Sequence, residues 1–209
     1  MAIEFAERLK SIPPYLFAEI EEKVSKKIDQ GVDIIDFGIG DPDLPTPSPI
    51  VNEIKKQLDD PENHRYPTSA GERDTRIAIA EWYLNRFGVE LNPDREVVIL
   101  LGSKEGLANV ARAFVNPGDM VLSPDPAYPV YSQGAALLCD AHPVKVPLYD
   151  NDDFLLNSDE CPNDARMLYL NYPNNPTAAV IEDDFFERVV AFAKKYDIAV
   201  IHDNAYSEL

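Results

Sequence analysis

From Gly71 onward, short apolar runs alternate with amphipathic helical segments, and this alternation limits the possible folds more than any other feature. The predicted strands are residues 97–101, 120–122, 143–146, 167–170 and 198–202. The predicted helices are residues 78–87, 104–114, 130–138 and 185–196. Strands separated by helices are typical of an α/β layer with a mainly parallel sheet. The pattern therefore predicts helices packed on a parallel sheet.

Ahead of that region the pattern is less regular. An amphipathic stretch over 15–30 ends at Gly31 and predicts a helix, because glycine commonly follows the last helical turn. Residues 34–37 predict a short strand that runs into the Gly- and Pro-rich loop 38–47. Residues 49–58 predict another helix, with proline in its first turn.

The charge balance excludes several kinds of partner. The formal net charge is -18 over 209 residues, so the surface repels phosphate backbones and anionic membranes. No apolar run is long enough to span a bilayer, and the first residues lack the features of a signal peptide. Cys139 and Cys161 are too few for a disulfide framework and show no metal-ligand spacing. We expect a soluble, cytoplasmic protein without a metal, nucleic acid or membrane partner.

Three polar loops follow predicted strands: residues 102–106, 171–177 and 203–206. In parallel sheets, ligands bind beyond the carboxyl ends of the strands, so these loops are the candidate binding region. The turn containing Ser103 and Lys104 joins a strand to a helix, and free N–H groups there favour an anion. Glycine and serine also cap many such turns without binding anything.

Three side chains in the later loops could contact a ligand. Asp203 ends an apolar strand and needs a partner if buried, because an unpaired buried charge is costly. It could keep a heterocyclic nitrogen protonated, or it could simply cap the following segment. Asn175 could donate to a phenolate oxygen, or it could be an ordinary turn asparagine. Tyr206 could reach the same ligand, or it could be a half-buried tyrosine.

Taken in order, segments 172–177 and 203–206 resemble the class I and II aminotransferases, which are fold-type I enzymes dependent on pyridoxal 5'-phosphate (PLP). The Gly-Asp-Pro-Asp loop at 40–43 precedes them in the expected order. The resemblance implies a PLP-dependent transferase-like three-layer αβα fold with a mainly parallel sheet, truncated before its C-terminal part. It also implies that 1–48 contributes to a small domain and that 49–209 is part of the large PLP-binding domain.

The resemblance also implies cofactor-binding roles. Ser103 and Lys104 match the turn whose amides hold the phosphate, and Tyr128 matches the aromatic ring stacked on the pyridine. Asp203 matches the partner of the ring nitrogen. The remaining matches are Asn175 and Tyr206 at the ring oxygen and Tyr66 at the phosphate of a neighbouring subunit. The last match implies a homodimer with shared active sites.

Gly40 matches a backbone contact beside the substrate carboxylate, and Tyr15 lies in a further segment expected to contact substrate. Within the family, segments 13–20, 63–67, 102–106 and 125–131 are most similar to LL-diaminopimelate aminotransferases. Such an enzyme moves an amino group between glutamate and tetrahydrodipicolinate in lysine biosynthesis. An aspartate or aromatic aminotransferase, a C–S lyase and a non-catalytic PLP-binding module stay open as alternatives.

Two further points bear on these expectations. The lysine that the family uses to bind PLP covalently lies in a Ser-x-x-Lys segment after Asp-x-x-Tyr, and the sequence ends at Leu209. No catalytic lysine is therefore assigned, and we expect residues 1–209 to be inactive alone. Ala178 stands where the family usually has glycine, and a positive φ there would destabilise the loop.

Overall fold

The computed structural model describes residues 3–38, 40, 44–150, 156–157, 161–181 and 184–209, without the side chains of residues 16 and 17. By its internal contacts the chain divides into two compact units. One consists of Met1–Ile12 and Leu100–Leu209, and the other of Pro13–Ile99. Each unit has its own secondary structure and is described by itself. The predicted division into 1–48 and 49–209 concerns the domains of a whole enzyme and stays a prediction.

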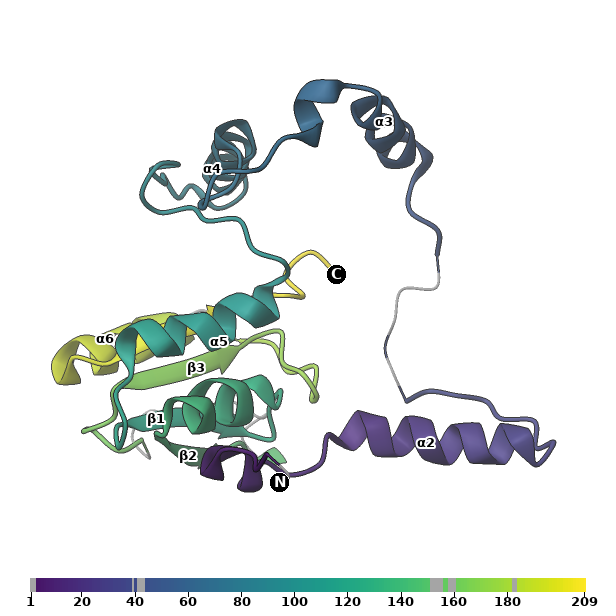
Figure 1. The fold of residues 1–209 in the computed structure, drawn as a ribbon. Helices are drawn as coiled ribbons and strands as arrows, with labels where there is room; N and C mark the ends of the chain where they lie inside the picture. The colour runs from purple at the N-terminus through teal and green to yellow at the C-terminus, as the bar shows by residue number, and fades with distance from the viewer. Residues whose placement is uncertain (1–2, 39, 41–43, 151–155, 158–160, 182–183) are drawn as a thin grey trace. The chain divides into compact units, whose positions relative to one another are not determined.

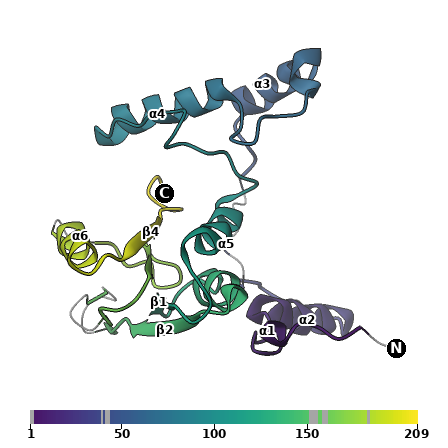
Figure 2. The ribbon, with the colours of Figure 1, turned by 60° about the vertical axis from the view of Figure 1, so that its left-hand side comes forward.

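The first unit is built on a four-stranded parallel sheet in the order β2-β1-β3-β4. Its strands are β1 (Met120–Asp125), β2 (His142–Pro147), β3 (Met167–Asn171) and β4 (Ala199–Asp203). Figure 1 labels the first three, and Figure 2 labels β4. Asn171 and Asp203 are register partners at the carboxyl ends of the two adjacent strands β3 and β4. The sheet therefore brings the loops that follow these strands to one edge.

Helices cover both faces of this sheet, which makes three layers (Figure 2). Successive side chains of a strand point to opposite faces. On β3, Met167 and Tyr169 pack with the core beneath α5 (Ser103–Phe114). Leu168 and Leu170 pack with the core beneath α6 (Phe185–Tyr196). All four side chains are fully buried, which explains why β3 reads as a continuous apolar run. The predicted α/β fold is confirmed.

The segment after β1 is helical, as expected over 130–138, but its geometry differs. Residues Val130–Ala136 form η2, a π-helix, and Leu137–Cys139 form the 3₁₀ turn η3. The turn ends at Asp140, which forms a 3.1 Å ion pair with Arg8 of the short helix α1 (Glu7–Lys10). π-helical turns are rare and are often found at functional sites.

The second unit contains α2 (Leu16–Asp29), α3 (Ser48–Leu58), η1 (Pro61–His64) and α4 (Arg73–Phe87). These bounds agree with the helices predicted over 15–30 and 49–58, whereas α4 begins five residues before the predicted residue 78. Gly88 ends α4 in the left-handed conformation with φ +68°, and its N–H donates to the Leu84 carbonyl. Glycine adopts this conformation without steric cost, which explains the helix end.

Two predicted strands are absent from the structure, and both predictions were wrong. Residues 34–37 and 97–101 have no strand pairing. Ile35 and Phe37 are 81% and 91% exposed, and Leu101 is 97% exposed. The Ile99 N–H bonds the Ala70 carbonyl in a single loop contact rather than a ladder. An apolar run becomes a strand only where a neighbouring strand satisfies its backbone, and neither run has such a neighbour here.

In the part of the chain that the structure describes, no helix is both long enough and apolar enough to span a bilayer. The same residues contain no group of three or more His, Cys, Asp or Glu side chains placed to hold a metal ion.

Candidate cofactor site

The carboxyl ends of β3 and β4 bring together three residues singled out from the sequence. Asn175 follows β3, and its Nδ2 donates a 3.3 Å hydrogen bond to the Tyr206 hydroxyl beyond β4. Asp203 is the last residue of β4, and all three side chains are half-buried. The loops after two adjacent strands therefore place an amide, a phenol and a carboxylate at one edge of the sheet.

Asp203 is held by a residue not identified from the sequence. The Tyr131 hydroxyl, from η2, donates a 2.8 Å hydrogen bond to Asp203 Oδ2. The Tyr131 side chain is fully buried. Burial and the neighbouring Asp203 carboxylate raise the pKa of Tyr131 far above its ordinary value, so its hydroxyl keeps its proton. Tyr131 is therefore a permanent donor to one oxygen of this carboxylate.

Asn171 connects the two loops beneath these groups. Its side-chain Nδ2 donates to the Asp203 backbone carbonyl at 2.8 Å, and its Oδ1 accepts the Asn175 backbone N–H at 2.7 Å. The residue is 1% exposed. One buried amide thus uses its donor and its acceptor to fix both loops. From the sequence, Asn171 is evident only as the first residue of a polar loop.

The loop 172–179 is ordered by its own hydrogen bonds. Asn174 Oδ1 accepts from the Thr177 backbone N–H at 3.1 Å and from its hydroxyl at 2.8 Å. The Asn174 carbonyl accepts the Ala178 N–H, and the Asn174 N–H donates to the Ala179 carbonyl. Ala178 has φ +60°, so the alanine that replaces the family's usual glycine adopts a left-handed conformation that is unfavourable for a residue with a Cβ. The Ala178 N–H closes the turn that contains Asn175 by returning to the Asn174 carbonyl.

The turn before α5 presents the exposed N-terminus of a helix. Gly102 precedes the helix with φ +93° and ψ +145°, a conformation that only glycine adopts readily. Ser103 and Lys104 are the first residues of a twelve-residue helix and are exposed, so their backbone N–H groups lie at its positive end. The Glu105 carboxylate accepts the Leu101 N–H at 3.0 Å and closes the turn from behind.

Tyr128 lies beside this turn. The Lys104 ammonium stands 5.3 Å from the centre of the Tyr128 ring, within the range of a cation–π contact. The Tyr128 ring meets the Tyr131 ring edge-on, with centroids 6.1 Å apart. A chain of contacts therefore runs from the start of α5 through two tyrosines to Asp203. This chain links three predicted positions, Lys104, Tyr128 and Asp203. Two more, Asn175 and Tyr206, are hydrogen-bonded to each other at the same edge of the sheet.

The remaining predicted residues belong to the Pro13–Ile99 unit. Gly40 is exposed, and residues 41–43 of its Gly-Asp-Pro-Asp loop lie outside the described residues. Tyr66 is 99% exposed and Tyr15 is 43% exposed. The roles expected for Gly40, Tyr15 and Tyr66 stay predictions.

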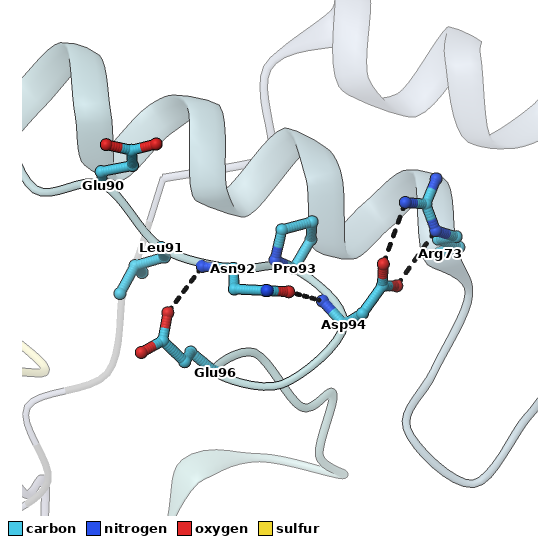
Figure 3. Close-up of a pocket in the computed structure, with 7 residues that line it drawn as sticks. All are labelled: Arg73, Glu90, Leu91, Asn92, Pro93, Asp94 and Glu96. Carbon is cyan, nitrogen blue, oxygen red and sulfur yellow. Dashed lines mark hydrogen bonds and ion pairs between the residues drawn. The ribbon is translucent and has the colours of Figure 1, made fainter.

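A recess in the same unit is formed by α4 and the loop 89–96 (Figure 3). Arg73 makes two 3.0 Å hydrogen bonds to the Asp94 carboxylate, and this pairing lowers the pKa of Asp94. The Glu96 carboxylate accepts the Asn92 N–H at 2.6 Å, and Asn92 Oδ1 accepts the Asp94 N–H. Arg73, Asp94 and Glu96 are thus engaged in contacts between the loop and α4 or within the loop, so we assign no ligand to the recess.

Comparison with known proteins gives a consistent result. Residues 32–209 match the family of class I and II aminotransferases. The LL-diaminopimelate aminotransferase of Aquifex aeolicus (strain VF5) is 52% identical over 210 residues, which cover 99% of this chain and 54% of that protein. The chain thus spans about half the length of the curated relatives that it matches.

Solved structures agree in fold. The substrate-bound BacF structure from Bacillus subtilis superposes with a TM-score of 0.91 at 34% identity, covering 99% of this chain and 53% of that one. A mutant aspartate aminotransferase of Thermus thermophilus superposes with a TM-score of 0.90 at 23% identity. The expected transferase-like αβα fold is confirmed.

Proposed function

The chain belongs to the class I and II aminotransferases, and from that premise we propose that the protein transfers amino groups with PLP as its cofactor. The observation that carries the proposal is the grouping of Asn175, Asp203 and Tyr206 at the carboxyl ends of β3 and β4. A half-buried carboxylate beside two neutral donors suits a heterocycle with a basic nitrogen and an anionic oxygen. The residues present therefore fit PLP.

Each group has a distinct task in this proposal. Asp203 would hold the ring nitrogen in its protonated form, because an adjacent carboxylate favours a cation. Tyr206 receives a hydrogen bond from Asn175, so its own proton is available for the ring oxygen. The N–H groups of Ser103 and Lys104 would hold the phosphate, and the Tyr128 ring would cover one face of the cofactor.

PLP, when bound, supplies an electron sink for the negative charge that develops at the substrate α-carbon. The contribution of this chain is to orient the cofactor and to keep its ring cationic. The proposed reaction of the whole protein exchanges an amino group between glutamate and a keto acid. We propose that the whole protein is a homodimer, in which Tyr66 of one subunit reaches the phosphate site of the other.

The proposed amino-acid substrate is LL-diaminopimelate. Tetrahydrodipicolinate is the compound formed when LL-diaminopimelate gives up its amino group. This proposal is supported by the 52% identity to the Aquifex aeolicus protein, which extends along nearly the whole chain. BacF has the same fold but is less similar in sequence, at 34% identity.

The test is a set of parallel assays on the purified full-length protein. Glutamate formation from 2-oxoglutarate would be measured with LL-diaminopimelate, aspartate and an aromatic amino acid as alternative donors. We expect the highest kcat/KM with LL-diaminopimelate. A higher value with another donor would reject the proposed substrate, and PLP binding without any turnover would reject the aminotransferase activity.

A further inference from the structure

We infer that Tyr131 is a positioning residue for Asp203, acting through its hydroxyl on one oxygen of that carboxylate. The inference rests on the proposed PLP site and assigns a role to a residue outside it. Tyr131 donates to Oδ2 at 2.8 Å, so Oδ1 is the oxygen assigned to the cofactor nitrogen.

The Tyr131 ring is fixed by its surroundings. It stacks on the Tyr169 ring with centroids 5.0 Å apart and an interplanar angle of 13°. Tyr169 is itself fixed, because its hydroxyl donates to the Leu107 carbonyl of α5 at 2.6 Å. Both tyrosines are fully buried. A donor held this firmly restricts the carboxylate that it contacts to one orientation.

The backbone also favours this role. Tyr131 is the second residue of the π-helix η2, which begins directly after Pro129. The wider turn changes the direction of side chains relative to an α-helix, and such turns often occur at functional sites. Here the π-helix directs Tyr131 to β4, whereas Tyr128, which precedes the π-helix, lies beside Lys104.

The chemical consequence concerns the proton shared by the cofactor and Asp203. A hydrogen bond to a carboxylate favours its charged form. A charged Asp203 leaves the proton on the ring nitrogen, which is the state that makes PLP an effective electron sink. Removing the Tyr131 hydroxyl should therefore let that proton move toward the carboxylate and loosen the carboxylate's orientation.

The test compares Tyr131→Phe with Tyr169→Phe in the full-length protein. Both variants remove one buried hydroxyl from the same pair of stacked rings, but only the first removes a donor to Asp203. PLP labelled with nitrogen-15 in its ring would report protonation by NMR, and titration would give its dissociation constant. Asp203→Ala serves as the reference for a lost ring-nitrogen partner.

For Tyr131→Phe we expect the ring-nitrogen signal to move toward that of neutral pyridine and PLP affinity to fall about three- to tenfold. Tyr169→Phe keeps the Tyr131 hydroxyl on Asp203 and removes only an anchor of the stacked ring, so both changes should be clearly smaller in it. Equal behaviour of the two variants would overturn the inference. If Tyr131→Phe does not fold, a fluorinated tyrosine at position 131 keeps the shape and strengthens the donor; an unchanged PLP affinity then also overturns the inference. If the unsubstituted protein does not bind PLP, or Asp203→Ala changes nothing, the proposed function itself fails.

Discussion

Asn171 and Asp203 face each other across β3 and β4, and the Asn171 amide donates to the Asp203 carbonyl at 2.8 Å. The same amide accepts the Asn175 N–H at 2.7 Å. The positions of Asp203 and Asn175 are therefore coupled through one buried side chain rather than set by two independent loops. A change at Asn171 should act on both proposed PLP contacts together.

We expect Asn171→Ala to lower the free energy of unfolding by about 1–3 kcal/mol, because it leaves the partly buried Asn175 N–H and Asp203 carbonyl without their partner. PLP affinity should fall as well, since both loops lose their common support. Urea unfolding and a PLP titration on the full-length protein would measure the two effects. Asn109→Ala is the control: Asn109 is exposed on α5, and its loss should change stability by less than about 0.5 kcal/mol. Unchanged PLP affinity in Asn171→Ala would show that the loops are held independently.

Substitutions at two glycines that flank α5 can distinguish the effect of backbone strain on PLP affinity from the effect of losing the proposed phosphate site. Gly102 precedes the helix with φ +93°, and Gly118 follows it with φ +87°; an added Cβ meets nothing within 4 Å at either position. Substitution by alanine should destabilise each by about 1–3 kcal/mol through strain alone. We expect only Gly102→Ala to weaken PLP binding, because only that turn presents the proposed phosphate site.

Urea unfolding and PLP titration of both alanine variants would test this difference. Equal losses of PLP affinity would mean that strain lowers affinity wherever it occurs. The Gly102 turn would then have no special role in binding phosphate.

The parts of the fold that were predicted correctly from the sequence are those whose apolar side chains are buried. The helix predicted over 185–196 has the bounds of α6, because its apolar stripe packs on the sheet and Asp197 ends it with φ +56°. Fully buried β3 was likewise evident as an apolar run. Residues 34–37 and 97–101 are also mainly apolar but have no strand beside them. Pairing depends on tertiary structure, which local sequence does not contain.

The candidate site shows the same limit. Asp203, Asn175 and Tyr206 could be identified because their spacing along the chain is specific to a family. Tyr131 and Asn171 act through partners 72 and 32 residues away, and nothing in their local sequence signals this. The π-helical form of η2 was also unpredicted, since hydrophobic periodicity over seven residues does not distinguish it from an α-helix.

His202 predicts how stability depends on pH. Burial lowers its pKa, only partly offset by its 3.0 Å contact with the Tyr172 carbonyl and by the nearby Asp203 carboxylate. The folded state therefore binds a proton less readily than the unfolded state, whose histidine has a pKa of about 6.5. The contribution of neutral His202 to the free energy of unfolding is therefore fully present above about pH 6.5 and is lost as the pH falls below that value.

We expect the free energy of unfolding to fall between pH 7.5 and pH 5.5, and less steeply in His202→Gln than in the unsubstituted protein. Glutamine can keep the hydrogen bond to Tyr172 but cannot be protonated. His142→Gln, at an exposed position, should retain the original slope. Parallel slopes in all three proteins would remove His202 as a cause of acid sensitivity.

Ala178 offers a way to stabilise the loop that carries Asn175. Its φ of +60° is unfavourable for any residue with a Cβ, and its N–H must keep its bond to the Asn174 carbonyl. Ala178→Gly removes that steric penalty but makes the unfolded chain more flexible, so we expect a net gain of about 0.5–1 kcal/mol in the free energy of unfolding. Ala179→Gly, next along the same loop and without a positive φ, should instead destabilise the protein by about 0.5–1 kcal/mol. Urea unfolding of the two variants would test this prediction. Changes of opposite sign in the free energy of unfolding require the left-handed conformation at Ala178. A loss of stability in both variants would show that the loop relaxes out of that conformation.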